Sequence, residues 1–328
     1  MKAYIHSVGS YVPDRRISNH ELSSMVDTSD EWIFSHTGIR NRHVSPDEVA
    51  ASDLAVNASL KVLKSSGIDP SDIDLVLVAT TTPDFIGIPS TACIVQHRVM
   101  AKNAGAMDIS AACTGFIYGL ETARMFIHSG TASYILVIGS EVFSKIVNWK
   151  DRNTCVLFGD GAGAAIVAAN RGNTESEIID SVLKSEGHGA NYLIRPVGGT
   201  KNPFIPGKSK VEDMYIKMEG RKVYNFAIRA ICQTIDCLLR RNKLNLEDVK
   251  YIVPHQANVR IIKAAAKRLN IDVEKFYMNI EEYANTSAAS IPIAMEQMER
   301  EGLLRRGDTI LTVGFGGGLT YGGNLIKW

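Results

Sequence analysis

The sequence has no long hydrophobic run, since nowhere do eighteen apolar residues follow one another, so we expect no membrane-spanning helix. The N-terminus carries only Lys2 before a short apolar stretch broken by His6, Gly9 and Pro13, which is not the pattern of a signal peptide. Neither sign of charge dominates, because 36 Lys and Arg stand against 35 Asp and Glu. This balance argues against a disordered chain and against a global nucleic-acid-binding surface.

Cysteine is also scarce, with five residues in a chain of 328. They show neither C-x-x-C spacing nor the density of a disulfide scaffold, and none has the companions of a metal ligand. We therefore expect free thiols, a cytoplasmic location, no metal and no resident cofactor. A length of 328 residues predicts about two domains, each large enough to bury a core.

Two stretches half a chain apart share the same order of elements. In residues 52–79 and again in 227–253, apolar residues at helical spacing lead through a turn into an apolar strand. The turns repeat at an offset of 176 residues (72 to 248), and the predicted strands 134–139 and 309–314 repeat at an offset of 175 (134 to 309). A period near half the chain length predicts two copies of one βα unit rather than a solenoid.

We expect an α/β fold made of two duplicated halves, residues 1–171 and 172–328, with the boundary near 170–173. Buried strands such as 135–138 carry Val, Ile and Leu on both faces, as parallel strands do. Residues 187–213 are rich in Gly, Pro and Lys and predict a long surface excursion. Loops of this length are usually lids, binding loops or disordered segments, and the sequence leaves all three open.

Cys113 stands where the predicted strand end at 107–110 turns into a helix. At a helix start, unpaired backbone N–H groups and the positive end of the helix dipole favour thiolate over thiol, which a nucleophile requires. An arbitrary intracellular cysteine is most often a small buried hydrophobe, and we interpret the other four in that way. Cys113 is the candidate nucleophile.

His255 and Asn285 are candidate partners from the second half. His255 follows the carboxyl end of the predicted strand 249–253, where open α/β sheets form their sites. Either residue could instead serve its own helix, His255 by bonding to its neighbours and Asn285 as an N-cap. In the half-chain alignment, however, Cys113 falls opposite position 288, inside the segment that Asn285 opens. We therefore expect Cys113 and Asn285 near a pseudo-twofold axis, with His255 beside them.

Two glycine-rich segments, 159–163 and 314–318, have neither the G-K-[ST] ending nor the following helix of a phosphate-binding loop. Apolar β-type runs follow both of them. We predict that each is a turn between strands, where glycine allows unusual φ and N–H groups can face an oxyanion.

Five ordered motifs carry a family resemblance: DISAACTGF around Cys113, PHQAN around His255, NTSAAS from Asn285, FGDGAGA from Phe158 and GFGGGLTYG from Gly314. Together they resemble the 3-oxoacyl-[acyl-carrier-protein] synthase III (beta-ketoacyl-[acyl-carrier-protein] synthase III) family of the thiolase superfamily. The resemblance covers the chain from the DEWIFSHTGIR segment to the C-terminus. The set Cys, His, Asn separates this type from Cys-His-His elongating synthases and from Cys-His-Cys thiolases.

The resemblance implies a layered αβαβα thiolase fold and a homodimer. It also implies a decarboxylative Claisen condensation of a short acyl-CoA, either acetyl-CoA or a small branched analogue, with malonyl-ACP. The products are 3-oxoacyl-ACP, CoA and CO₂, and the reaction initiates type II fatty acid synthesis. Acyl-CoA is in this case a substrate and not a cofactor.

The resemblance assigns roles to individual residues as well. Cys113 would hold the acyl group, the backbone N–H groups of Cys113 and Gly317 would stabilise the oxyanion, and His255 with Asn285 would stabilise the enolate. Further implied contacts are Trp32 and Arg152 on the CoA adenine, Asn258 near the pantetheine arm, Ile88 and Phe315 at the acyl pocket, and Arg260, Lys263 and Lys267 for ACP docking.

Several positions depart from the family pattern. Ala284 precedes Asn285 where many members have glycine, and Asn225 stands where the docking helix is expected to carry lysine. Ile88 occupies a place where several members carry an aromatic residue from the partner subunit that bounds the acyl pocket. The 187–213 excursion is longer than usual, so the length of the primer is open.

Three alternatives compete. A related thiolase-fold enzyme that uses malonyl-CoA or a longer acyl primer would keep the same three residues. A papain-like cysteine hydrolase shares the chain order Cys, His, Asn. The sequence has no C-G-[SA]-C-[WY] signature, however, and a duplication of the two halves is not expected in such a protease. A non-catalytic homologue would be expected to lose one of the three residues.

Overall fold

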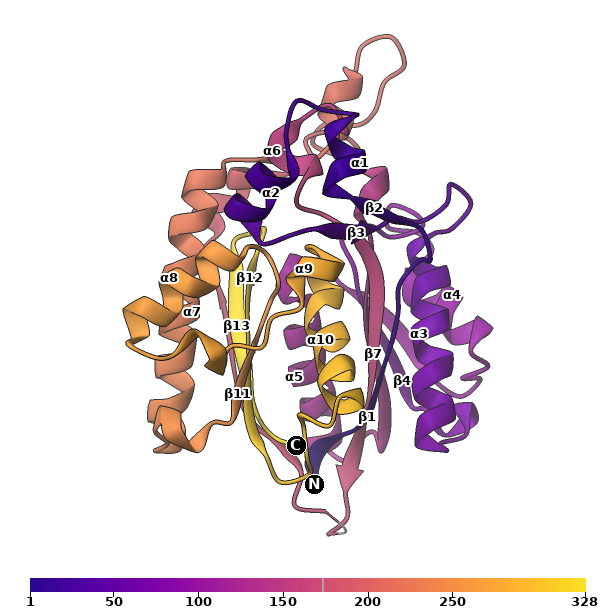
Figure 1. The fold of residues 1–328 in the computed structure, drawn as a ribbon. Helices are drawn as coiled ribbons and strands as arrows, with labels where there is room; N and C mark the ends of the chain where they lie inside the picture. The colour runs from indigo at the N-terminus through magenta and orange to yellow at the C-terminus, as the bar shows by residue number, and fades with distance from the viewer. Residues whose placement is uncertain (173) are drawn as a thin grey trace.

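The computed structural model describes residues 1–172 and 174–328, so Asn173, at the predicted boundary, lies outside the described residues. Two mixed β-sheets lie on either side of a central pair of helices, and further helices cover the outer face of each sheet (Figure 1). This is the αβαβα layering of a thiolase-like fold. Within the described part of the chain, every helix is too short or too polar to cross a membrane.

The first sheet belongs to the first half of the chain and has five strands. The pairs β1·β7 and β6·β7 are antiparallel, whereas β4 pairs in parallel with both β6 and β5. Across the sheet the strands are β1 (Lys2–Tyr11), β7 (Asp160–Asn170), β6 (Tyr134–Val142), β4 (Leu75–Ala79) and β5 (Gly105–Ile109).

The second sheet repeats this pattern in the second half. Its strands in order are β8 (Glu177–Ser185), β13 (Thr320–Lys327), β12 (Thr309–Gly316) and β11 (Tyr251–Pro254). As in the first sheet, the first two pairs are antiparallel and the third is parallel. Ile252 of β11 also bridges in parallel to Phe276, at the place that β5 takes in the first half. The predicted duplication is therefore confirmed, and β7 and β8 flank the expected boundary.

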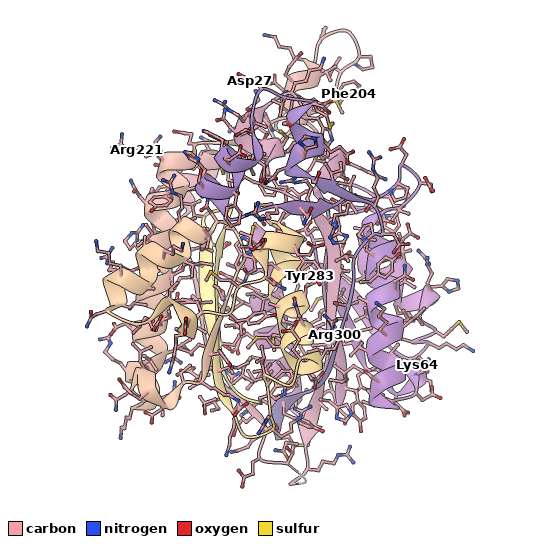
Figure 2. All side chains as sticks on the ribbon, viewed as in Figure 1. Asp27, Lys64, Phe204, Arg221, Tyr283 and Arg300 are labelled. Carbon is pink, nitrogen blue, oxygen red and sulfur yellow. The ribbon has the colours of Figure 1, made fainter. Side chains whose placement is uncertain are left out.

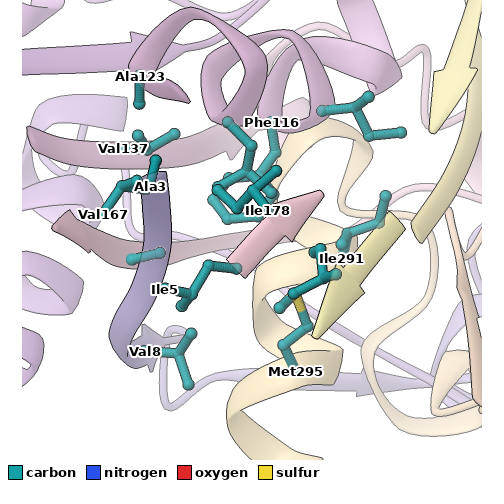
Figure 3. Close-up of a cluster of buried hydrophobic side chains, with 14 of the residues drawn as sticks. Ala3, Ile5, Val8, Phe116, Ala123, Val137, Val167, Ile178, Ile291 and Met295 are labelled. Atoms are coloured by element: carbon teal, nitrogen blue, oxygen red, sulfur yellow. The ribbon is translucent and has the colours of Figure 1, made fainter. Parts of the chain in front are cut away.

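The helices complete the layers. The outer face of the first sheet packs against α3 (Ala51–Ser66) and α4 (Thr91–Arg98), and that of the second against α7 (Gly220–Asn242) and α8 (Val259–Leu269). The central layer is α5 (Gly115–His128) with α10 (Ser290–Arg300). Phe116 of α5 and Ile291 and Met295 of α10 share one core with Ile5 and Val167 of the first sheet (Figure 3). Both halves of the chain therefore contribute to this core.

Short elements gather at one end of the sheets (Figure 1). They are β2 (Arg16–Ser18), α1 (Asn19–Ser23), α2 (Asp30–Thr37), β3 (Asn41–His43), α6 (Arg152–Cys155), β9 (Leu193–Ile194), β10 (Lys217–Met218) and α9 (Ile280–Tyr283). The predicted excursion 187–213 starts here. It contains β9, which pairs with β10 just after the excursion ends. Its tip is largely exposed, and Phe204 is one of the exposed residues at this end of the molecule (Figure 2).

One glycine-rich prediction is wrong. Residues 159–163 do not form a turn between strands, because β7 begins at Asp160 and the preceding element is the short helix α6. A Cβ on Gly163 would lie 2.7 Å from a side-chain carbon of Pro292, so glycine here allows β7 to pass close to α10. In the second segment, β12 continues to Gly316 and only the connection to Thr320 is a turn.

Candidate active site

The segments of Cys113 and Asn285 meet at the centre of the molecule. Short 3₁₀ turns, Ala112–Thr114 and Ser287–Ala289, precede the two central helices. Ala112 and Ser287 both have positive φ, 48° and 49°, at positions 175 residues apart. The second turn is packed tightly, because a Cβ on Gly139 would lie 2.2 Å from the carbonyl oxygen of Ala288. The duplication thus builds two equivalent strained turns side by side, and strain of this kind is typical of functional sites.

Cys113 lies at the start of α5, as predicted, and is buried. Burial raises the pKa of the Cys113 thiol to about 12, against a hydrogen bond from Ser287 that lowers it, and the charge of Glu141 raises it further. The expected preference for thiolate is therefore wrong for the resting protein, because loss of hydration outweighs the favourable position. A role as nucleophile would require the thiol to lose its proton.

One cavity brings the three candidate residues together. Cys113, His255 and Asn285 all line a space of about 150 Å³, together with Phe315. The rings of His255 and Phe315 meet edge to face with centroids 5.4 Å apart. A group held at the sulfur would therefore face both polar side chains of the second half.

The side chain of Asn285 has a fixed orientation. Its Oδ1 accepts a hydrogen bond from the backbone N–H of Ser287 at 2.8 Å. This contact leaves the NH₂ group as the donor toward the cavity. The backbone of Asn285 is also held, because Gly159 N donates to Asn285 O at 3.0 Å and Asn285 N donates to Leu157 O at 2.9 Å.

His255 is neutral in its surroundings, because burial lowers its pKa to about 3. Its Nδ1 lies 2.7 Å from the Ser290 hydroxyl, and that hydroxyl donates to Ser287 O at 2.8 Å. With the hydroxyl proton on Ser287 O, Ser290 accepts from Nδ1–H and Nε2 carries a lone pair. If the hydroxyl turns its proton to Nδ1, Nε2 carries the proton and becomes a donor. The Ser290 hydroxyl therefore allows either neutral tautomer of His255, with the proton on Nδ1 or on Nε2.

A second cavity of about 140 Å³ lies on another side of Cys113. Gly317, the expected oxyanion donor, lines it beside the sulfur, and Phe315 does not. Its other walls are mostly apolar and include Phe143, Ile146, Phe158, Leu193 and Ile216. Sequence reasoning missed these residues because an apolar side chain in a loop gives no local signal of what it lines.

Ile88, the other residue expected at the acyl pocket, is not brought to Cys113 of its own chain. Its side chain is 88% exposed, and it lines neither cavity at the sulfur. Within one chain, the two cavities at Cys113 are therefore built without Ile88.

Trp32, Arg152 and Asn258 line one open cavity of about 230 Å³. The Arg152 guanidinium lies 4.7 Å from the centroid of the Trp32 ring, and the ring of His36 stacks on Trp32 at 4.4 Å. Asn258 caps α8 and donates to His36 O at 3.0 Å. Sequence reasoning missed His36, although its position four residues after Trp32 on a predicted helix could have suggested the contact.

This open cavity adjoins the cavity at Cys113. Leu157, Tyr224 and Asn258 line both of them. A ligand held at Trp32 and Arg152 could thus extend an arm past Asn258 to the sulfur. Arg260 lies at the mouth of this route and is exposed, and Lys263 and Lys267 are exposed on the same helix, α8.

The duplicated fold and its buried cysteine place the chain in the class of thiolase-fold condensing enzymes, which are acyltransferases. Models of the 3-oxoacyl-[acyl-carrier-protein] synthase III family match residues 107–187, and models of its C-terminal part match residues 239–328. The chain belongs to the beta-ketoacyl-[acyl-carrier-protein] synthase III family, the enzymes of the initiating condensation in fatty acid synthesis.

Individual relatives are similar to this chain over nearly its full length. The chain is 49% identical over 324 residues to beta-ketoacyl-[acyl-carrier-protein] synthase III of Clostridium acetobutylicum, covering 99% of this chain and 98% of the relative. A crystal structure of 3-oxoacyl-[acyl-carrier-protein] synthase III from Aquifex aeolicus VF5 matches with a TM-score of 0.90 at 42% identity, over 99% of this chain and 100% of the other. The corresponding structure from Pseudomonas aeruginosa PAO1 matches with a TM-score of 0.92 at 38% identity, over 100% and 98%. These matches give no support to a cysteine hydrolase.

Proposed function

We propose that the chain condenses a short acyl-CoA with malonyl-ACP to give 3-oxoacyl-ACP, CoA and CO₂. The observation that carries this proposal is the continuous route from the Trp32 and Arg152 cavity to the cavity shared by Cys113, His255 and Asn285. The route suits a substrate with an aromatic base at one end and a thioester at the other.

Acyl transfer comes first. The sulfur of Cys113 bonds to the thioester carbon, and the backbone N–H groups of Cys113 and Gly317 stabilise the oxyanion of the tetrahedral intermediate. The C–S bond to CoA then breaks with its electron pair on the CoA sulfur. An acyl-cysteine remains, and its acyl chain enters the second cavity.

Condensation follows when a malonyl thioester replaces CoA. Loss of CO₂ leaves a carbanion whose enolate oxygen accepts hydrogen bonds from the NH₂ of Asn285 and from Nε2–H of His255. The carbanion attacks the acyl-cysteine carbon and expels the sulfur of Cys113. Because decarboxylation supplies the carbanion, this step needs donors rather than a strong base.

The second cavity supports a short primer. An apolar protein cavity of about 150 Å³ holds a benzene molecule, which has six carbon atoms. At about 140 Å³ the cavity beside Cys113 has room for acetyl and for small branched acyl groups but not for a long chain. The alternative with a long primer is accordingly disfavoured.

The proposal that the malonyl group arrives on ACP rests on the charge of the surface near the route. Arg260, Lys263 and Lys267 form an exposed basic face on α8 next to the mouth of the route, and acyl carrier proteins are acidic. This supports malonyl-ACP over malonyl-CoA as the acceptor. The five free thiols support a cytoplasmic location.

A homodimer is proposed through β5, which is one of the two edge strands of the first sheet. Its Met107 and the nearby Phe85 and Ile86 are exposed, so an edge that can pair is flanked by apolar surface. Pairing of two β5 edges would join the sheets of two copies. It would also give the exposed Ile88 a place against the partner, as the family resemblance implies.

The proposed function predicts that acetyl-CoA or isobutyryl-CoA labels the protein with one acyl group on Cys113. The measurement is mass spectrometry of the intact chain and of its peptides after incubation with a series of acyl-CoAs. Addition of malonyl-ACP should then remove the label and release 3-oxoacyl-ACP, with malonyl-CoA as the comparison. Label on another residue, or no label from any acyl-CoA, contradicts the proposal.

We further expect that Trp32→Ala raises the KM for acyl-CoA about tenfold and changes kcat little. The ring contacts Arg152 and His36 and would stack on the adenine, and a stacking contact is worth about 1–3 kcal/mol. Steady-state kinetics measures the effect. The control is an acyl-pantetheine substrate, which has no adenine and should not distinguish the variant from the wild type. An equal loss with both substrates would place the role of Trp32 in folding.

A further inference from the structure

Glu141, at the carboxyl end of β6, is a completely buried acid that the reaction scheme above does not use. Thr81 N and Thr81 Oγ1 each donate to it at 3.0 Å, Thr82 Oγ1 donates at 2.8 Å and Ser287 Oγ donates at 2.9 Å. All of these donors are neutral, and among the contacts of the described residues no Lys or Arg pairs with it. Burying a carboxylate without a counter-ion is unfavourable in free energy, which indicates that Glu141 has a role at this position.

Ser287 connects this acid to the nucleophile. Its hydroxyl donates to Glu141, and Ser287 lines the cavity of about 140 Å³ together with Cys113, where its side chain lowers the pKa of the thiol against the effect of burial. A hydroxyl has one proton and two lone pairs, so while Ser287 donates to Glu141 its oxygen can accept the thiol proton. The three groups form a chain from sulfur through hydroxyl to carboxylate.

The position of Ser287 is held firmly. Its φ of 49° lies in a region that serine seldom adopts. Its N–H donates to Asn285 Oδ1 and its carbonyl oxygen accepts from Ser290 Oγ, so the surrounding contacts fix the turn. The hydroxyl is thus kept between the two acidic groups.

The thiol needs a proton acceptor, and two candidates lie near it. A proton on His255 would create a buried imidazolium beside a buried thiolate, and burial already lowers the His255 pKa to about 3. Burial raises the pKa of Glu141 instead, because its protonated form is neutral. Transfer to Glu141 leaves one charged group in the buried site, whereas transfer to His255 leaves three. It is therefore the less costly of the two transfers.

We propose that Glu141 accepts the proton of Cys113 through the hydroxyl of Ser287 during acyl transfer, an inference that rests on the proposed function. Cys113 passes its S–H proton to Ser287 Oγ while Ser287 passes its own proton to Glu141. The sulfur takes over the negative charge and bonds to the thioester carbon, and the bond between that carbon and the CoA sulfur breaks. The CoA thiolate then takes a proton from water, and the hydroxide formed takes the proton of Glu141.

The relay predicts a characteristic pH profile. The titratable and charged groups that face Glu141 and the cavity in front of it are Cys113 and Arg195. Protonated Glu141 cannot accept a proton, so the rate of acylation falls as the pH falls through its raised pKa. The inflection therefore lies above the usual range of a glutamate.

The test is the single-turnover rate of acylation by acetyl-CoA, followed by mass spectrometry from pH 5 to 10. Glu141→Gln keeps the shape of the side chain, and we expect it to slow acylation at pH 7 at least about 100-fold. The acid inflection should disappear, and the rate should rise about tenfold per pH unit as the thiol itself ionises. Ser287→Ala retains Glu141 but interrupts the chain and should show the same loss.

Asp160→Asn is the matched control. Asp160 is also a completely buried acid with neutral hydrogen-bond donors, Ser45 N, Ser144 N and Ser144 Oγ, but it has no link to Cys113. It should retain the acid inflection, and thermal unfolding of all variants separates loss of folding from loss of the relay. Acylation of Glu141→Gln at the wild-type rate with the same inflection overturns the relay, whereas absence of acylation in the wild type would overturn the proposed function itself.

Discussion

Cys113→Ser is expected to abolish acyl transfer, with a loss of at least ~10⁴-fold in the single-turnover rate. A hydroxyl is far less acidic than a thiol, and burial at this position already raises the pKa of the thiol to about 12. Serine hydrolases compensate with a histidine that a carboxylate orients, but the Nδ1 partner of His255 is the hydroxyl of Ser290. His255 is therefore not arranged to activate a serine, and a carboxylate reached through Ser287 is too weak a base to take the proton of a hydroxyl.

The measurement for Cys113→Ser is acyl transfer from radiolabelled acetyl-CoA, with mass spectrometry of the protein. Cys155→Ser is the matched control, because Cys155 is equally buried and burial raises its pKa to about 11, yet it lines neither cavity at the active site. This control should be labelled like the wild type. A labelled Cys113→Ser protein would show that the acyl group is carried elsewhere.

Much of the fold could be predicted because its signals are local or periodic. The strand 75–79 has apolar residues at every position, and the structure has the strand with these bounds. The offset of 175 residues placed Cys113 opposite the Asn285 segment, and the paired turns at Ala112 and Ser287 lie at that same offset. Repetition within one chain therefore supplied a long-range contact that periodicity alone cannot give.

The features that sequence reasoning missed depend on contacts between distant segments. Glu141 is an acid inside an apolar strand, and only its contacts with Thr81 and Ser287 make it part of the site. The helix start at Cys113 is a local signal, but the burial that determines its pKa comes from elements that pack around it. In the same way, Gly163 resembled a turn residue because its close neighbour Pro292 lies 129 positions away in the sequence.

His255→Ala is expected to retain acyl transfer and to lose condensation. The low pKa of the buried ring, about 3, makes it a poor acceptor for the thiol proton, so the first step should stay within about threefold of the wild type. In the second step the enolate loses one of its two donors, and removal of such a donor costs about 10²–10³ in kcat. Acyl-enzyme should therefore accumulate when acetyl-CoA and malonyl-ACP are both present.

The variant Asn285→Asp tests the second hydrogen-bond donor to the enolate oxygen, the NH₂ group of Asn285. The aspartate retains an oxygen for the N–H of Ser287 but places a negative charge where Asn285 has its NH₂ group. Condensation should fall at least as far as in His255→Ala, because a carboxylate repels the enolate. Decarboxylation of malonyl-ACP and mass spectrometry of the acyl-enzyme distinguish the two steps in both variants. If His255→Ala instead lost acyl transfer with the same pH dependence as Glu141→Gln, the ring of His255 would be the proton acceptor of Cys113. The assignment of proton acceptance to Glu141 and of enolate stabilisation alone to His255 would then be wrong.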